Sequence, residues 1–272
     1  MNMTISAAQV KELREKTGLG LMDCKKALEE ANGNIDLAIE ELRKTSGVKA
    51  SKKSGRSAAD GLIGIMDNGP DRFMTEVNCE TDFVARDESF VQFTEETLKT
   101  YANNSEKNLE QLLEEGIEAN REKLVQKLGE NIVVRRVART VDSTVTGSYL
   151  HSNKKIGCLV SLEGGSESLA NDIAMHAAAT DPMAVSPDDI PKDIVDKERE
   201  IFKAQSEDSG KPPEIVEKMI EGKVSKFLSE VSLTEQDFVK DPNQKISKLL
   251  KDNNAHILNF IRYEVGEGIE VE

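Results

Sequence analysis

The sequence predicts a multidomain α+β protein with an N-terminal three-helix domain, a two-part core of small antiparallel sheets covered by helices, and a protruding antiparallel helical hairpin. Its 272 residues exceed the ~100–200 residues of one ordinary domain. Up to Leu42 the apolar residues recur at three- and four-residue steps, which is typical of amphipathic helices. From Leu62 the period shortens to two, as in strands, and the order strand, strand, helices, strand then occurs twice.

The N-terminal domain, which we place at residues 1–56, is expected to hold three short helices and a basic linker. The helical period is interrupted at Thr17–Gly20 and at Asn32–Asn34, where glycine or asparagine can take the left-handed conformation that ends a helix. The segment 43–56 holds six basic residues and no acidic one, with Val48 as its single large apolar residue. We interpret this segment as a solvated linker, and contact with RNA or a partner protein is the alternative.

The first half of the core, which we place at residues 57–141, opens with a β-hairpin. Its strands are Leu62–Met66 and Phe73–Cys79, joined by a turn at Asn68–Asp71, and the alternation in the second strand predicts one buried face. The elements expected next are a long helix, more helix and a strand, at about Thr81–Tyr101, Leu109–Leu128 and Ile132–Val137.

The second half of the core, at residues 142–188 and 231–272, repeats this order. Two strands are expected around a turn at His151–Lys154, followed by one helix and a last strand. Their ranges are Val145–Leu150, Ile156–Leu162, Ser166–Thr180 and Ile257–Val265. We infer two related α+β units from this repeated pattern.

Residues 189–230 are inserted in the second half of the core and are mostly polar. Apolar residues three and four apart form stripes on two predicted helices. Between the helices, Ser209–Pro213 contains two prolines, which favour a turn followed by a helix start. We expect an antiparallel helical hairpin that serves either as a lever for contacting a partner or as a passive decoration.

The charge and composition exclude several classes of protein. The net charge is −14, and Met1–Ala58 carries three more basic than acidic residues, which leaves −17 for the rest. A protein that binds nucleic acid chiefly through phosphates needs the opposite sign. No stretch approaches the ~18 apolar residues of a membrane span, and Met1–Val10 lacks the pattern of a secretory signal. We therefore expect a cytosolic protein without a direct nucleic-acid or membrane partner.

Catalytic machinery is not visible in the sequence. There is no glycine-rich phosphate loop, HExxH or GxSxG motif, and His151, His176 and His256 fall in separate predicted elements. His176 lies on an apolar stripe, which favours a packing role. The three cysteines lack disulfide or zinc spacing and are expected to be reduced and buried, at Cys24, Cys79 and Cys158. We expect no covalent catalysis, no cofactor and no bound metal.

One strand-to-helix junction, Asn78–Arg86, is a candidate functional site. Thr81 is a suitable N-cap, and Asp82 faces the positive end of the helix dipole, so both also fit an ordinary helix start. The ring of Phe83 can either tuck under the sheet or project beyond the helix end. From the residues alone, the preference of large apolar side chains for the interior favours a buried ring.

Two long ungapped motifs make the sequence similar to a known family. They are Leu13–Gly18 with Met22–Leu28, and Glu76–Ala85. Four shorter matches occur in the family's order, at Gly129–Ile132, Ile173–His176, Gly210–Pro212 and Phe260–Gly268. Over nearly the entire chain the sequence closely resembles bacterial elongation factor Ts, the guanine-nucleotide exchange factor of elongation factor Tu.

This resemblance implies a fold and a set of site residues. The fold is a ubiquitin-associated-like N-terminal domain, a two-part α+β core and a protruding coiled-coil hairpin. The stretch that intrudes into the partner and dislodges its magnesium ion corresponds to Thr81, Asp82, Phe83 and Val84, which reverses the preference for a buried ring. The implied partner contacts are Leu21, Met22 and Lys25, then Leu128 and Gly129, and finally His151.

The implied activity is that of a cytoplasmic translation elongation factor in protein biosynthesis. It binds elongation factor Tu with GDP, promotes GDP release by displacing magnesium, and so allows GTP to bind. The alternative is a protein- or RNA-binding scaffold or chaperone without exchange activity, which would use the basic segment and the helical hairpin. An enzyme is the third choice.

Overall fold

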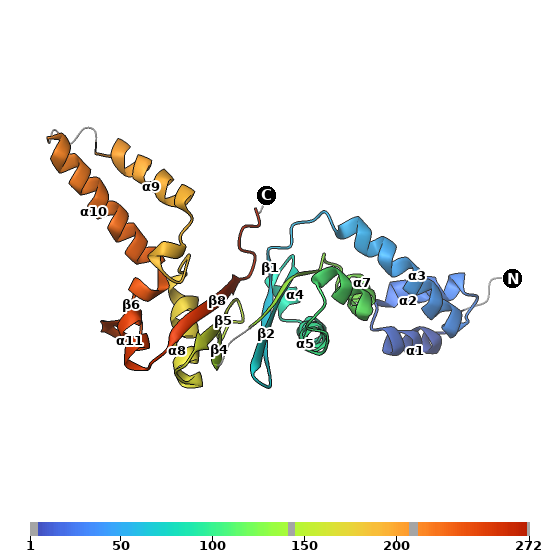
Figure 1. Cartoon of the computed structure of the whole chain (residues 1–272). Coiled ribbons are helices and arrows are strands. Elements are labelled where there is room, and N and C mark those ends of the chain that lie inside the picture. Colours follow the sequence, from blue (N-terminus) through green and yellow to red (C-terminus); the bar gives the residue numbers. More distant parts are fainter. Residues whose placement is uncertain (1–4, 141–144, 207–211, 271–272) are drawn as a thin grey trace. The chain divides into compact units, whose positions relative to one another are not determined.

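The structure is a computed structural model that describes residues 5–140, 145–206 and 212–270 (Figure 1). The chain folds into two compact units. Within the described residues, unit 1 comprises 5–66, 73–138 and 263–270, and unit 2 comprises 67–72 and the residues from 139 to 262. Both units mix helices with a small sheet, which confirms the predicted α+β class.

Three helices form the N-terminal part of unit 1, as the sequence predicts. They are α1 Ala7–Thr17, α2 Leu21–Glu30 and α3 Ile35–Lys53. Gly18 ends α1 at φ 68°, and the Asn34 side chain caps the start of α3 by accepting from the Asp36 and Leu37 backbone N–H groups. Val10, Leu13, Leu28 and their neighbours form a small apolar core of their own between these helices.

The linker expected at residues 43–56 is wrong for residues 43–53, because α3 continues through them as one helix. Ser46 and Ala50 are buried on this helix, and Ala50 belongs to the apolar core of unit 1. Lys49 pairs with Asp23 at 2.9 Å. The segment lacks large apolar residues, but small side chains let one helix pack closely against another, here α3 against α7 Glu118–Leu128.

The sheet of unit 1 has the order β1-β2-β3, with strands Asp60–Asn68, Asp71–Cys79 and Val133–Arg139. The two-residue link between β1 and β2 can join only antiparallel neighbours, so the predicted hairpin is confirmed. The single buried face predicted for β2 is wrong. Both faces are covered, since Phe73 and Val77 are buried, and so are Glu76 and Asn78 on the opposite face.

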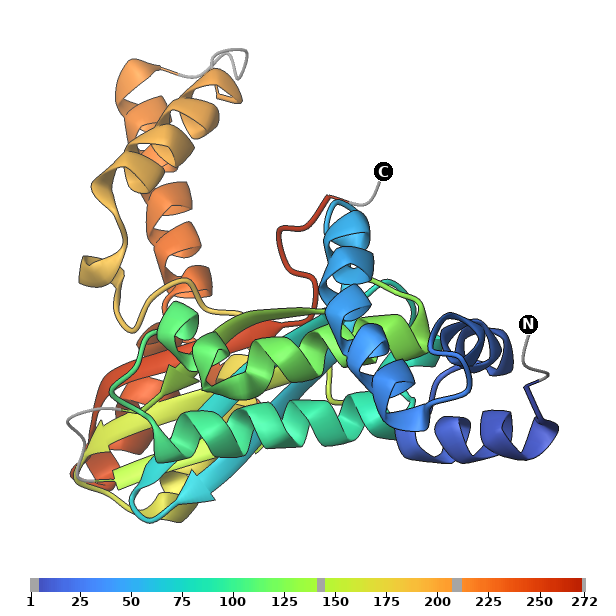
Figure 2. The same ribbon diagram turned by 90° about the vertical axis from the view of Figure 1, so that its right-hand side faces the viewer.

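The helices after β2 are more broken than the sequence predicts. They are α4 Asp82–Ala85, α5 Glu88–Asn103, α6 Leu109–Leu112 and α7, with a π-helical turn at Leu113–Ile117 between the last two. Asp87 interrupts the first predicted helix because its side chain caps a new start, accepting from the Ser89 N–H at 2.8 Å. Gly116, at φ 93°, breaks the second. Figure 2 shows α5 and α7 running beside each other.

Glu76 is the polar centre of unit 1, with a fully buried side chain in β2. Its carboxylate accepts hydrogen bonds from Arg135 at 3.1 Å, Arg136 at 2.5 Å and the Gly266 backbone N–H at 2.9 Å. The Arg136 guanidinium also stacks on the Tyr263 ring, 3.9 Å from its centroid. These contacts hold the residues after position 262 against the sheet of unit 1.

The sheet of unit 2 has the order β4-β5-β8, with strands Val145–Leu150, Ile156–Glu163 and His256–Glu264. β4 and β5 pair antiparallel, as predicted, and helix α8 Glu167–Thr180 packs on them. A Cβ atom at Gly147 would lie 2.3 Å from the Ala170 carbonyl carbon, so only glycine lets α8 approach β4 this closely. The recurring order strand, strand, helix, strand is thus present in both sheets.

Two further helices of unit 2, α9 Lys192–Ala204 and α10 Pro213–Val231, lie side by side in both views (Figures 1 and 2). Arg199 of α9 pairs with Glu221 of α10, and the Lys223 ammonium lies 5.6 Å from the Phe202 ring centroid. Of the turn expected at Ser209–Pro213, residues 209–211 lie outside the described residues. Pro213 begins α10, as expected of a proline after a turn.

A small hairpin and one helix of unit 2 are not anticipated by the sequence. They are β6 Asp237–Phe238, β7 Asp241–Lys245 and α11 Ile246–Asp252. His176 packs beside this hairpin with a fully buried side chain. Its Nδ1 accepts from the Val239 N–H at 3.2 Å, so its Nε2 carries the proton and donates to the Gln236 side chain at 2.9 Å. The predicted packing role of His176 is confirmed.

Candidate functional site

The junction between β2 and α4 is a well-formed helix start. Thr81 is extended, with φ −132° and ψ 156°, and its hydroxyl accepts from the Val84 N–H at 3.4 Å. Asp82 lies in the first turn, where its charge favours the helix dipole, and it pairs with Arg86 at 2.8 Å. The predicted capping role of Thr81 is confirmed.

The Phe83 side chain projects into solvent and is 80% exposed. Its neighbours Val84 and Ala85 are buried in the core of unit 1, so α4 is anchored by one face and presents Phe83 on the other. The buried ring that residue preference alone favours is therefore wrong. An exposed aromatic ring on a rigid helix start is a ready contact for a hydrophobic cavity of another protein.

A carboxylate from a distant part of unit 1 holds this helix start. The Glu130 Oε2 atom accepts from the backbone N–H groups of Glu80 and Thr81, each at 3.0 Å. Its Oε1 atom accepts from the Thr81 hydroxyl at 2.6 Å. In addition, the Cys79 thiol donates to the Thr81 carbonyl at 3.2 Å. In the turn before Asp82, hydrogen bonds thus hold the backbone of Glu80 and Thr81 and the side chain of Thr81.

A second carboxylate joins the same two chain segments, residues 80–81 and 130–131. Here the acceptor is Glu80 and the donor belongs to the segment 130–131. The Glu80 carboxylate accepts from the Asn131 backbone N–H at 2.6 Å and from Arg56 at 3.4 Å. The buried Asn131 side chain donates to the Arg56 carbonyl at 2.8 Å. Residues 80–81 and 130–131 therefore brace each other, and the stretch after α3 is fastened to both.

Leu128 and Gly129 lie next to this brace, at the end of α7. Gly129 has φ 82°, a left-handed conformation that ends the helix and turns the chain into Glu130. Its N–H donates to the Val125 carbonyl at 3.0 Å, and its own carbonyl accepts from Lys53. The structure thus connects two groups of predicted site residues, Thr81–Val84 and Leu128–Gly129, through Glu130.

Leu21, Met22 and Lys25 lie together at the start of α2. Leu21 is 55% and Met22 is 73% exposed, although both are large apolar residues. Lys25 is also exposed and lies 3.8 Å from Glu29, one turn further along the helix. Two exposed apolar side chains and one exposed cation thus lie within the first two turns of α2.

His151 belongs to unit 2 and begins the turn between β4 and β5. Its N–H donates to the Ile156 carbonyl at 2.9 Å, and its carbonyl accepts from the Lys154 N–H at 2.7 Å. The imidazole is stacked beside the Tyr149 ring at a centroid distance of 6.4 Å. A half-exposed ring on a tight turn is available for contact with another molecule.

Known proteins resemble this chain along almost all of its length. The sequence model of the family described as Elongation factor TS matches residues 80–267, more than two thirds of the chain. Elongation factor Ts of Marinobacter nauticus is 54% identical over 270 residues, covering 98% of this chain and 93% of the relative. The chain belongs to the elongation factor Ts family. Its members are elongation factors of protein biosynthesis that promote guanine-nucleotide exchange.

Other elongation factor Ts sequences agree with the first to a similar extent. The Hahella chejuensis protein is 53% identical over 270 residues, covering 98% of this chain and 94% of its own length. The protein of Francisella tularensis subspecies novicida is 52% identical over 272 residues, with 98% and 93% covered. The family match begins at Glu80, directly before the braced helix start, and the relatives extend the likeness over α1–α3 as well.

Among the residues that the structure describes, no group of three or more His, Cys, Asp or Glu side chains is placed to hold a metal ion. No described helix is long and apolar enough to cross a membrane.

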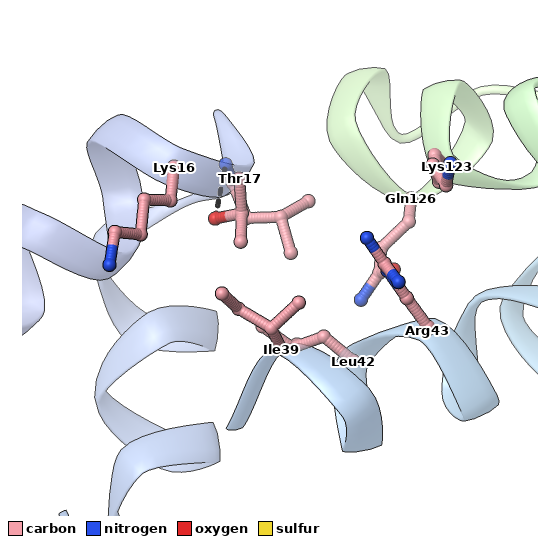
Figure 3. A pocket seen from close by; sticks show the side chains of 8 residues that line it. Lys16, Thr17, Ile39, Leu42, Arg43, Lys123 and Gln126 are labelled. Carbon is pink, nitrogen blue, oxygen red and sulfur yellow. Dashed lines mark hydrogen bonds between the residues drawn. The ribbon is translucent and has the colours of Figure 1, made fainter. Parts of the chain in front are cut away.

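A cavity of about 200 Å³ lies in unit 1 between the C-terminal end of α1 and residues from within α3 and α7 (Figure 3). Cationic and aliphatic side chains line it, among them Lys16, Arg43, Lys123, Ile39 and Leu42. None of the predicted site residues contributes to this lining.

Sequence reasoning missed Glu130 as part of the site. Its partners Glu80 and Thr81 lie 50 and 49 residues away in sequence, so no local pattern connects them. Two signals are available: Glu130 directly follows a glycine that ends a helix, and it lies within the family match Gly129–Ile132. An acidic side chain in such a turn has freedom to accept backbone hydrogen bonds from elsewhere.

Proposed function

We propose that this chain binds elongation factor Tu carrying GDP and accelerates GDP release by displacing the magnesium ion of the partner. The family supports the partner and the exchange activity. The observation that carries the mechanism is the exposure of Phe83 on a helix start that Glu130 and Thr81 hold in place. In this proposal the chain has no cofactor and makes or breaks no covalent bond.

The proposed mechanism is a coupling between two ligands of one partner. The exchange factor and GDP each weaken the binding of the other by the same factor. Phe83, seated between elements of the GTPase together with Thr81, Asp82 and Val84, displaces the loops that hold magnesium and phosphate. The phosphate charge is then left uncompensated, GDP leaves faster, and GTP can bind and expel the factor.

We further propose that the remaining predicted contacts act as docking points. Leu21, Met22 and Lys25 form one of them, Leu128 and Gly129 a second, and His151 a third. Several separate contacts raise the affinity because each later one forms within an existing complex. The exposure of the large apolar side chains of Met22 and Leu21 supports a role in docking.

The finer architecture is also a proposal. We propose that α1–α3 form a ubiquitin-associated-like domain, and that α9 and α10 form a coiled-coil hairpin projecting from the second half of the core. The domain limits proposed are 1–56, 57–141, 142–188 with 231–272, and 189–230. We also propose that the protein acts in the cytoplasm, where translation elongation takes place.

The test is the release of labelled GDP from purified elongation factor Tu, with and without this chain. We expect the intact chain to accelerate release, and Phe83→Ala to lower that acceleration about thirtyfold, equivalent to ~2 kcal/mol. Phe83→Ala should unfold at the same temperature as the intact chain, because the ring is exposed.

Val239→Ala, which also shortens an exposed apolar side chain, is the matched control and should keep full activity. Full exchange by a less stable Phe83→Ala protein would refute the mechanism. Salt-dependent RNA binding by a chain that leaves GDP release unchanged would favour the scaffold or chaperone function instead.

A further inference from the structure

We infer that Glu130 is a positioning residue for the exchange reaction, and that its carboxylate fixes the turn that presents Asp82 and Phe83 to the partner. The inference rests on the proposed function and adds to it a residue that touches neither nucleotide nor magnesium. It acts through Thr81. The geometry of the brace and the shortness of the helix that it supports point to this role.

The helix that carries Phe83 is too short to hold its orientation by its own backbone hydrogen bonds. α4 has four residues, and isolated helices shorter than ~12–15 residues are marginal in water. The cap that Thr81 supplies to the Val84 N–H is long, at 3.4 Å. The direction of the Phe83 side chain therefore depends on what fixes Thr81, in addition to the buried Val84 and Ala85.

Glu130 supplies that restraint with three hydrogen bonds from two consecutive residues. Two of them reach backbone N–H groups at 3.0 Å, and one reaches the Thr81 hydroxyl at 2.6 Å. Hydrogen bonds to a carboxylate are roughly twice as strong as neutral ones. Because they bind both the backbone N–H and the hydroxyl of Thr81, they restrain its φ and its side-chain rotamer together.

The base of the brace is itself rigid. Gly129 ends α7, and the backbone N–H of Asn131 donates to Glu80 at 2.6 Å. Asn131 is 2% exposed and bonds the Arg56 carbonyl at 2.8 Å. Glu130 therefore stands between two anchored residues.

This rigidity has a direct effect on binding. An exposed ring on a loose turn would lose conformational freedom when it seats in the partner, and the binding energy would be reduced by that loss. A ring that is already held in its docking orientation loses little conformational freedom when it seats and opens the nucleotide pocket of the partner. Removing the brace should then lower the maximal rate of GDP release more than the affinity of the first encounter.

The variant that tests this is Glu130→Gln, with Glu95→Gln as the matched control. The amide keeps the size of the side chain, and its one oxygen can still accept from the N–H groups of Glu80 and Thr81, but its nitrogen cannot accept from the Thr81 hydroxyl. The remaining bonds also lose the charge that strengthens hydrogen bonds to a carboxylate. Glu95 is exposed on α5, so its substitution changes charge alone. Glu130→Asp retains the charge but shortens the reach, and serves as a second variant should Glu130→Gln not fold.

The measurement is GDP release from elongation factor Tu at increasing concentrations of each variant. We expect Glu130→Gln to lower the maximal acceleration about tenfold and to change the half-saturating concentration less than about threefold. Glu130→Asp should fall between this variant and the intact chain. In a Phe83→Ala background, Glu130→Gln should cause no further loss, because it acts through the same ring.

A second measurement reports the brace without the partner. Hydrogen exchange of the Glu80 and Thr81 amides should be about tenfold faster in Glu130→Gln than in Glu95→Gln. Thermal unfolding of both variants shows whether the whole fold has changed. A purely structural role would lower the unfolding temperature and leave the maximal rate at equal folded concentration unchanged.

The outcomes separate the two proposals. An intact chain that fails to accelerate GDP release overturns the proposed function, and the inference falls with it. An active intact chain with an equally active Glu130→Gln overturns the inference alone, as does unchanged exchange of the two amides. Additive losses in the double variant would also overturn it, since Glu130 would then act apart from Phe83.

Discussion

At the scale of single residues, this protein places a carboxylate where a core would ordinarily be apolar. The Glu76 side chain is fully buried, yet two guanidinium groups and a backbone N–H of the last strand's extension surround it. Burial raises the pKa of Glu76, but the hydrogen bonds from Gly266 and Arg136 outweigh it and hold the pKa below its ordinary value of 4.5. The carboxylate is therefore charged and stabilises the native fold.

The depressed pKa of Glu76 predicts a pH-dependent stability. A group whose folded pKa is lowered adds stability above its unfolded pKa, and this contribution disappears as the pH falls through the folded value. We expect Glu76→Gln to lower the free energy of unfolding by about 2 kcal/mol at neutral pH. The difference from the intact chain should shrink as the pH falls below about 4.5.

Urea denaturation at several pH values measures this effect. Glu95→Gln, on the exposed face of α5, should stay close to the intact chain throughout. A gap between Glu76→Gln and the intact chain that widens toward acid pH would contradict the prediction.

The burial of some single residues could be predicted from the sequence, and the exposure of Phe83 could not. The burial of Cys24 and His176 follows from residue preference and apolar stripes, and the structure confirms both. The exposure of Phe83 does not follow, because residue preference points inward and only the buried faces of Val84 and Ala85 leave the ring outside. The resemblance to the family was needed to anticipate it.

At the scale of elements, α3 is the clearest departure from expectation. A basic segment without large apolar residues looks like a linker, but Ala50 is 1% exposed against the core of unit 1. Local composition cannot reveal that a small residue faces another helix. Local composition also fails for β2. Its alternation of apolar and polar residues suggests one buried face, but both faces of the strand are covered.

Substitutions in the last part of α3 test whether it is folded. We expect Ala50→Glu to lower the free energy of unfolding by about 3 kcal/mol, because it places a charge and extra volume in a packed interface. The neighbouring Ser51→Glu is exposed and should change the stability by less than about 0.5 kcal/mol. Denaturant unfolding compares the two variants, and equal stabilities would show that the segment is not packed.

At the scale of the whole molecule, the charge sets the choice of partners. The net charge of −14 repels phosphate backbones, although the N-terminal residues carry a small positive excess. The repeated order of strands and helices could be predicted from periodicity, since each unit has its own strand and helix periods. The brace between residues 80–81 and 130–131 could not, because it joins positions far apart in sequence.

This charge predicts weak binding to nucleic acid. We expect single-stranded RNA to bind with a Kd no tighter than about 10⁻⁴ M at physiological salt, which is the weak end of the ~10⁻⁴–10⁻⁶ M range of non-specific contacts. Fluorescence anisotropy with a labelled oligonucleotide measures the affinity. Binding in the micromolar range with a steep salt dependence would revive the RNA-associated scaffold or chaperone.

The burial of all three cysteines has a practical consequence. Cys24, Cys79 and Cys158 are inaccessible, and burial raises the pKa of Cys158 to about 12. An exposed thiolate is the nucleophile that reacts with thiol reagents, so the native protein should resist maleimide dyes. A cysteine introduced on the surface, as in Lys99→Cys on α5, would then accept a single fluorophore without removal of the native thiols. Complex formation could be followed by energy transfer from that one dye.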